Sequence, residues 1–132
     1  LFRSEAEAKP IIMIVEDSSH FRNQLKTMLS QRGYEVIDAK DAEEGLELLG
    51  DQKIDLIICD LNLPGMDGLQ MVKILRANHD PKIEIMMLTT ESTREQVESA
   101  KKLGVKAWII KPVSIEALDH AIVKVLGRDT LP

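Results

Sequence analysis

Residues 54–68 decide the fold, and they read Ile54-Asp55-Leu56-Ile57-Ile58-Cys59-Asp60-Leu61-Asn62-Leu63-Pro64-Gly65-Met66-Asp67-Gly68. The stretch joins a short apolar run, an acidic residue at the end of that run, and a turn rich in proline, glycine and aspartate. A short apolar run bounded by turn signals is typical of a strand buried on both faces. Such strands occur in parallel sheets covered by helices. The stretch therefore predicts an α/β protein with Asp60 at the carboxyl end of a central strand.

Apolar runs and amphipathic helical patterns alternate on both sides of this stretch. Strands are predicted at residues 11–15, 34–39, 56–60, 83–88 and 107–110. Residues that can begin the helices are Ser18 or Ser19, Asp41 with Glu44, Asp67-Gly68, Ser92 with Glu95 as a capping box, and Ser114. Glycines that can end four of them are Gly33, Gly50, Gly104 and Gly127. Five strand–helix pairs with short links predict a doubly wound parallel sheet with helices on both faces.

Length and composition indicate one soluble domain. The chain has 132 residues, of which 44% are hydrophobic and 30% are charged. We expect residues 1–9 to be a disordered lead-in or a remnant of cloning, residues 10–128 to form the domain, and residues 129–132 to be a short tail. The one cysteine, Cys59, lies in an apolar run, so we expect it to be a small buried hydrophobe.

Charge and hydropathy exclude several classes of protein. The net charge of −5 argues against a nucleic-acid-binding surface, which needs a basic stripe. No apolar run approaches the roughly 18 residues of a membrane span, and the N-terminus has no signal-peptide pattern. We therefore expect a cytoplasmic protein that contacts no membrane.

Polar residues follow four of the predicted strands: Glu16-Asp17, Asp60, Thr89 and Lys111. In open α/β sheets, functional groups gather at the carboxyl ends of the strands. Two carboxylates ~5 Å apart repel by about 3 kcal/mol at an effective dielectric constant of ~20. A fold that gathers three of them needs a cation, and oxygen ligands of this kind suit Mg²⁺.

Each of these residues also has a purely structural explanation. Glu16-Asp17 can cap a helix or face solvent, Thr89 can be a strand-end residue, and Lys111 can be a loop lysine. Together they favour phosphoryl chemistry. Asp60 can bind metal or attack phosphorus, Lys111 can supply a fixed positive charge, and Thr89 can donate a hydrogen bond to a phosphoryl oxygen.

With these residues in place, the chain resembles the receiver domains of bacterial two-component response regulators. The matching elements are Glu16-Asp17, Asp60, Pro64, Asp67-Gly68, Thr89 and Lys111-Pro112, within residues 10 to about 128. No single element is specific, but the complete set is. The resemblance implies a flavodoxin-like, CheY-like (βα)5 fold with strand order 2-1-3-4-5.

The resemblance also implies a mechanism in which a histidine kinase transfers its phosphoryl group to Asp60 in a Mg²⁺-dependent step. Asp17 and Asp60 would bind the metal directly, the backbone carbonyl of Asn62 would be a third ligand, and Glu16 would act through water. Lys111 would pair with Asp60 or its phosphate, and its bond to the following proline would be cis. Such a domain catalyses only its own phosphorylation and dephosphorylation and is no enzyme otherwise.

In the family, the residue at Thr89 moves toward the phosphate, and an aromatic residue on the last strand swings inward behind it. Trp108 occupies the aromatic position, where tyrosine or phenylalanine is usual. It either toggles in this way or simply packs on the fourth helix. Asn62 and Glu91 correspond to positions beside the path of the attacking water, and polar groups there predict a short-lived phosphoryl state.

Two segments, residues 87–92 and 104–112, look most like chemotaxis-type receivers. Winged-helix regulators usually carry an acidic pair where this chain has Lys106-Ala107. We expect a stand-alone receiver, monomeric or weakly dimeric after phosphorylation. Its fourth-helix, fifth-strand and fifth-helix face would bind a flagellar motor switch protein or another signalling protein. The alternatives are a receiver excised from a longer regulator and a constitutive protein-binding module.

Two other classes share the architecture. An FMN carrier would need uncharged, hydroxyl-rich phosphate-binding turns, but Glu16-Asp17 would repel the phosphate. A phosphatase with an aspartate nucleophile would need a carboxylate at position 62 as general acid, where this chain has Asn62. The three histidines, His20, His79 and His120, lack metal-ligand spacing and are expected on the surface.

Overall fold

The computed structural model describes residues 9–50, 52–78 and 83–127. Within them the chain forms one five-stranded parallel sheet with the strand order β2-β1-β3-β4-β5, as predicted. The strands are β1 (Ile11–Val15), β2 (Glu35–Ala39), β3 (Leu56–Cys59), β4 (Glu84–Thr89) and β5 (Ala107–Ile110). The helices are α1 (Ser19–Gln31), α2 (Ala42–Leu49), α3 (Gly68–Asn78), α4 (Arg94–Lys102) and α5 (Ile115–Val125).

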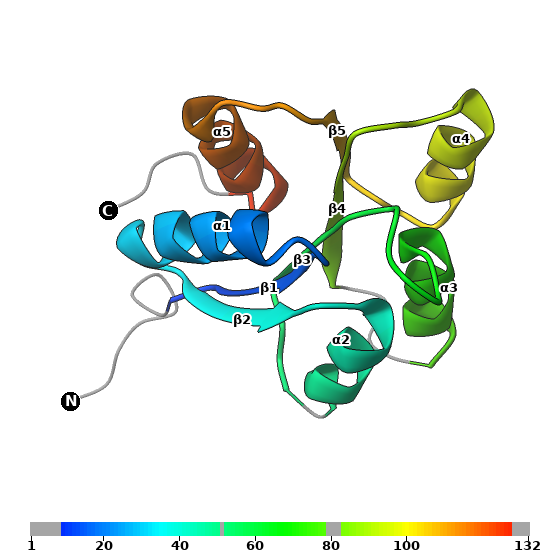
Figure 1. Ribbon diagram of the computed structural model, residues 1–132, viewed down its shortest axis with the longest axis horizontal. Coiled ribbons are helices and arrows are strands. Elements are labelled where there is room, and N and C mark those ends of the chain that lie inside the picture. Colours follow the sequence, from blue (N-terminus) through cyan, green and yellow to red (C-terminus); the bar gives the residue numbers. More distant parts are fainter. Residues whose placement is uncertain (1–8, 51, 79–82, 128–132) are drawn as a thin grey trace.

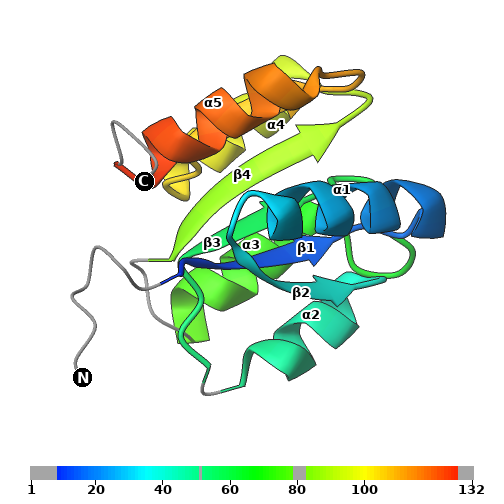
Figure 2. The same cartoon turned by 90° about the vertical axis from the view of Figure 1, so that its left-hand side faces the viewer.

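The sheet lies between two layers of helices, with α1 and α5 on one face and α2, α3 and α4 on the other (Figures 1 and 2). Side chains alternate between the faces along each strand. Ile12 and Ile14 of β1 join the core beneath α1 and α5, whereas Met13 and Val15 join the core on the opposite side. The central strands are buried on both faces, which explains their continuous apolar sequences.

Four strand boundaries differ from the prediction by one residue: β2 and β4 each begin one residue later, β3 ends one residue earlier, and β4 ends one residue later. β2 begins at Glu35 and not at position 34, because the backbone N–H of Tyr34 donates to the carbonyl of Leu29 at the end of α1 (3.1 Å). β4 extends to Thr89, which pairs with Ile110 of β5. The extension carries the Thr89 side chain to the carboxyl edge of the sheet.

The predicted caps of α1, α2 and α5 are present, since Ser18, Asp41 and Ser114 each accept a hydrogen bond from the first turn. The capping box predicted for α4 was wrong by one residue. Thr93 Oγ1 accepts from the N–H of Gln96 (3.2 Å), and Gln96 Oε1 accepts from the N–H of Thr93 (2.9 Å). This later pair satisfies both N–H groups, so the helix begins at Arg94.

Several sequence-based expectations concern the surface and the ends of the chain. His20 and His120 are exposed as predicted, whereas His79 lies outside the described residues. The predicted lead-in, apart from Lys9, and the tail at 129–132 also lie outside them. Within the described ranges, no helix has the length and apolar character needed to cross a membrane.

Candidate functional site

Three carboxylates meet at the carboxyl edge of the sheet. Glu16 and Asp17 follow β1, Asp60 follows β3, and these strands are neighbours in the sheet. Each carboxylate offers an oxygen within 4.8 Å of the other two. Glu16 and Asp60 are buried, with 3% and 8% of their surface exposed, whereas Asp17 is exposed. The structure thus brings together the acidic residues that the sequence placed at this edge.

One lysine reaches into this cluster. Lys111 follows β5, and its Nζ lies 2.6 Å from Glu16 Oε1 and 3.0 Å from Asp60 Oδ2. Its peptide bond to the following proline is cis, as predicted. One ammonium faces three carboxylates, so these four groups carry a surplus of two negative charges. Such a surplus favours the binding of a divalent cation.

Burial and ion pairing act against each other here. Burial raises the pKa of the Glu16 carboxyl, and the hydrogen bonds from Lys111 and from the N–H of Ser18 oppose this only in part. For Lys111, burial alone would lower the pKa, but the hydrogen bonds and charges of Glu16 and Asp60 outweigh it and raise the pKa. Lys111 therefore stays protonated at neutral pH.

Backbone contacts hold Asp60 in place. β3 ends at Cys59, one residue earlier than predicted, and Asp60 is the first residue after it. The N–H of Asp60 still donates to the carbonyl of Val15 (3.0 Å), and its Oδ1 accepts from the N–H of the exposed Asn62 (3.1 Å). Its Oδ2 binds Lys111, so both carboxylate oxygens have a partner and a fixed direction.

Gly68 allows the start of α3 to pack directly against Asp60. A Cβ at position 68 would lie 2.3 Å from the carbonyl oxygen of Asp60 and 2.9 Å from Cε of Met87. The N–H of Gly68 donates to the carbonyl of Leu61 (2.9 Å), which closes the loop after β3. Any side chain at position 68 would have to displace the backbone of the acidic cluster.

Gly68→Ala is therefore expected to destabilise the protein by about 1–3 kcal/mol, the usual range for overpacking, and to weaken Mg²⁺ binding. Urea unfolding measures the first effect and a Mg²⁺ titration the second. Gly33→Ala is the control. Gly33 has a positive φ and nothing within 4 Å of its added Cβ, so this variant should lose stability without losing Mg²⁺ affinity. Unchanged stability and affinity in Gly68→Ala would contradict the packing argument.

Thr89 and Trp108 each carry a buried donor atom that the described residues do not use. Thr89 is fully buried, and within the described part of the chain neither its Oγ1 nor the buried Nε1 of Trp108 has a hydrogen-bond partner. Trp108 packs against the core beneath α2, α3 and α4, which includes Ala100 of α4. This placement agrees with the alternative in which Trp108 packs toward the fourth helix. Glu91 is exposed. An unsatisfied buried donor costs about 1–3 kcal/mol. A ligand that accepts a hydrogen bond from the Thr89 hydroxyl would therefore recover this free energy.

The sequence did not indicate two further residues at the site. Phe21 lies in the first turns of α1, and its ring lies beneath the ammonium of Lys111, with the ring centroid 4.4 Å from Nζ. Arg22 Nη1 donates to the carbonyls of Glu16 (2.7 Å) and Asp17 (3.4 Å). The predicted helix start indicated that these residues lie near the acidic pair. Nothing in the sequence pattern indicated contact with a lysine at the far end of the chain.

Fold and site together define a flavodoxin-like α/β domain with an acidic cluster and one lysine at the carboxyl edge of its sheet. The family model of the response regulator receiver domain matches residues 12–123. The chain therefore belongs to the response regulator receiver domain family, whose members are signalling modules.

Relatives and solved structures agree with this assignment. The chain is 39% identical to the chemotaxis protein CheY1 of Helicobacter pylori, over 89% of this chain and 98% of that protein. It is 33% identical to the transcriptional regulatory protein AfsQ1 of Streptomyces coelicolor, over 90% of this chain and 52% of that protein. A CheY-like receiver domain from Methanospirillum hungatei superposes with a TM-score of 0.87 at 28% identity, over 91% of this chain and 95% of that one.

Proposed function

We propose that this receiver domain accepts a phosphoryl group on Asp60 from the phosphohistidine of a histidine kinase, in a step that requires Mg²⁺. The observation that carries the proposal is the Asp60 carboxylate itself. It is buried at the sheet edge, paired with Lys111, and within 4.8 Å of two further carboxylates. Membership in the receiver family supports the same role.

The donor set fits Mg²⁺, which prefers carboxylate and carbonyl oxygens and retains several waters. Asp17 and Asp60 would hold the ion directly, with the backbone carbonyl of Asn62 as a third ligand and Glu16 acting through water. The bound ion would neutralise charge on the phosphoryl oxygens. The surplus of negative charge around Lys111 supports this assignment.

In the proposed transfer, a carboxylate oxygen of Asp60 forms a bond to phosphorus while the bond between phosphorus and the donor's imidazole nitrogen breaks. The bonding electron pair leaves with the imidazole, and the product is an acyl phosphate. Lys111 already lies 3.0 Å from Asp60 Oδ2, so its ammonium can follow the new negative charge. The Thr89 hydroxyl, at the end of the neighbouring strand, has no hydrogen-bond partner among the described residues and would donate to a phosphoryl oxygen.

The output would be a change at the face formed by α4, β5 and α5, where Thr89 and Trp108 act as the switch. β5 is an edge strand, and its Ile110 is 45% exposed, so an apolar side chain on this face is accessible to a protein partner. We prefer a chemotaxis-type partner such as a flagellar motor switch protein, because residues 87–92 and 104–112 resemble chemotaxis-type receivers and the chain is 39% identical to the chemotaxis protein CheY1. Transcriptional output in a longer regulator is the second candidate, supported by the AfsQ1 match.

The test follows the sole tryptophan and the mass of the intact protein. Acetyl phosphate with Mg²⁺ should add one phosphoryl group and change Trp108 fluorescence, and EDTA should prevent both. No phosphoryl group under any condition would refute the proposed function. Phosphorylation without a fluorescence change would refute only the role of Trp108.

We also propose a short-lived acyl phosphate, because Asn62 and Glu91 are exposed to water. A lifetime of many hours after removal of the donor would contradict that.

A further inference from the structure

The ammonium of Lys111 is held from two sides. Glu16 and Asp60 bind it through hydrogen bonds, and the face of Phe21 lies beneath it, with Nζ 4.4 Å from the ring centroid. Only 16% of the Lys111 side chain is exposed, so the ammonium has lost much of its hydration. An ammonium has three donors, and the two carboxylates take two of them. The aromatic face is a further favourable surface in contact with the charge.

Phe21 belongs to a closed ring of contacts around the site. Its N–H donates to Ser18 Oγ (3.3 Å), and the N–H of Ser18 donates to Glu16 Oε2 (3.0 Å). Glu16 Oε1 binds Lys111 Nζ, which completes the ring at the face of Phe21. The cap of α1 therefore fixes the backbone that carries the aromatic ring. A shift of Phe21 would be felt by Lys111 directly and by Glu16 through Ser18.

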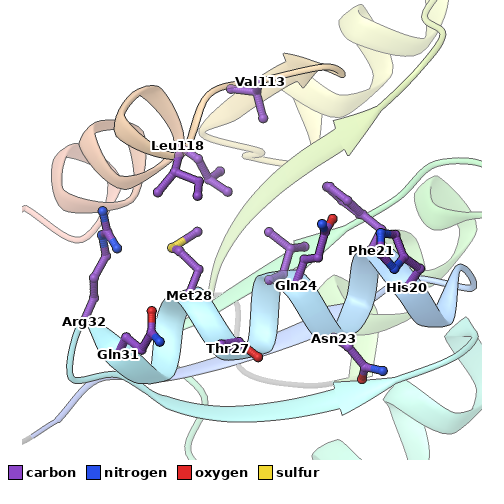
Figure 3. A pocket seen from close by; sticks show the side chains of 12 residues that line it. His20, Phe21, Asn23, Gln24, Thr27, Met28, Gln31, Arg32, Val113 and Leu118 are labelled. Carbon is purple, nitrogen blue, oxygen red and sulfur yellow. The ribbon is translucent and has the colours of Figure 1, made fainter.

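The ring of Phe21 stands at the site end of a groove of about 630 Å³ between α1 and α5 (Figure 3). Arg32 lies at the other end of the groove, where it forms an ion pair with Asp119 (3.0 Å). Phe21 is half-buried, so it is not part of the fully buried core. Its ring contacts the ammonium of Lys111. An apolar residue needed only to fill space between the helices would not have to contact the ammonium.

We propose that Phe21 is a positioning residue for phosphoryl transfer, acting through the ammonium of Lys111; this inference rests on the proposed phosphorylation of Asp60. During transfer the ammonium must leave part of its contact with Glu16 and follow the charge that develops on phosphorus. A hydrogen-bond partner beneath it would oppose this shift, because hydrogen bonds are directional. The aromatic face attracts the charge electrostatically over a broad area, so it holds the ammonium in both positions.

The test compares Phe21→Leu with Phe21→Tyr. Leucine keeps an apolar side chain but lacks the negative ring face, whereas tyrosine keeps the face. We expect Phe21→Leu to slow phosphorylation by acetyl phosphate about three- to tenfold at saturating Mg²⁺, and Phe21→Tyr to stay within about twofold of wild type. Met28→Leu is the control. Met28 lines the same groove away from Lys111, so this variant should keep the wild-type rate.

Two results would overturn the proposal. One is a wild-type rate in Phe21→Leu, and the other is an equal loss in the leucine and tyrosine variants, which would indicate a packing role alone.

A second measurement does not depend on phosphorylation. The ε-methylene protons of Lys111 should show an upfield ring-current shift in NMR spectra of wild type and Phe21→Tyr that disappears in Phe21→Leu. Absence of that shift in wild type would refute the contact. Failure of wild type to take up phosphate would instead refute the proposed function.

Discussion

Asp60→Asn is expected to abolish phosphoryl uptake from acetyl phosphate completely. The asparagine amide has nearly the same shape as the carboxylate, but it is not a nucleophile and cannot form an acyl phosphate. Intact-mass spectrometry in Mg²⁺ should therefore show one added phosphoryl group in wild type and none in the variant. The Trp108 fluorescence response should disappear with it. The fold should survive, because Lys111 keeps its shorter contact with Glu16 (2.6 Å).

The matched control is Asp55→Asn, at the opposite end of the same strand. Asp55 Oδ2 accepts from the N–H of Ile11 (2.7 Å), and the asparagine carbonyl oxygen can accept the same hydrogen bond. This variant should take up phosphate at the wild-type rate. Continued uptake in Asp60→Asn would place the phosphate on another group. The exposed Asp17 would then be the first residue to examine, because it belongs to the same cluster.

Strands and helices could be predicted well from the sequence because the physical signals for them are local. A buried parallel strand reads as a continuous apolar run, as at Leu56–Cys59, and a helix start needs a side chain such as Ser114 to satisfy its first N–H groups. The strand order came from the resemblance to a family. Where two local signals overlapped, as at Ser92 and Thr93, the sequence pattern favoured the wrong one.

The acidic cluster was predictable for a related reason. Parallel strands end at one edge of the sheet, and the strand order implied by the resemblance makes the first and third strands neighbours, so Asp17 and Asp60 were expected to lie near each other. Contacts that depend on tertiary packing could not be predicted. The ring of Phe21 beneath Lys111 joins the first helix to the loop after the last strand, and the fit of Gly68 against Asp60 depends on tenths of an ångström. Neither contact leaves a periodic trace in the sequence.

Lys111→Met is expected to destabilise the protein by about 3 kcal/mol at neutral pH without Mg²⁺. The variant keeps the length of the side chain but removes its charge. Glu16 and Asp60, exposed by only 3% and 8%, would then be two buried carboxylates without a cation. Urea unfolding in EDTA measures the loss. Lys26→Met is the control, because Lys26 is 49% exposed where it pairs with Asp38 (3.1 Å), so it should cost less than about 1 kcal/mol.

The pH dependence of the Lys111→Met deficit identifies its cause. Burial already raises the pKa of Glu16, and loss of the opposing lysine would raise it further. A carboxyl group whose pKa is higher in the folded than in the unfolded state stabilises the fold when protonated, and this contribution is lost as the pH rises through the folded pKa. The deficit should therefore be largest near about pH 8 and shrink toward about pH 5. Lys111 of wild type stays charged throughout, because its pKa is raised from 10.5.

Mg²⁺ should restore part of the stability lost in Lys111→Met, since it binds the same carboxylates in the folded state. A deficit that ignored both pH and Mg²⁺ would mean that Lys111 stabilises the site by packing and not by its charge.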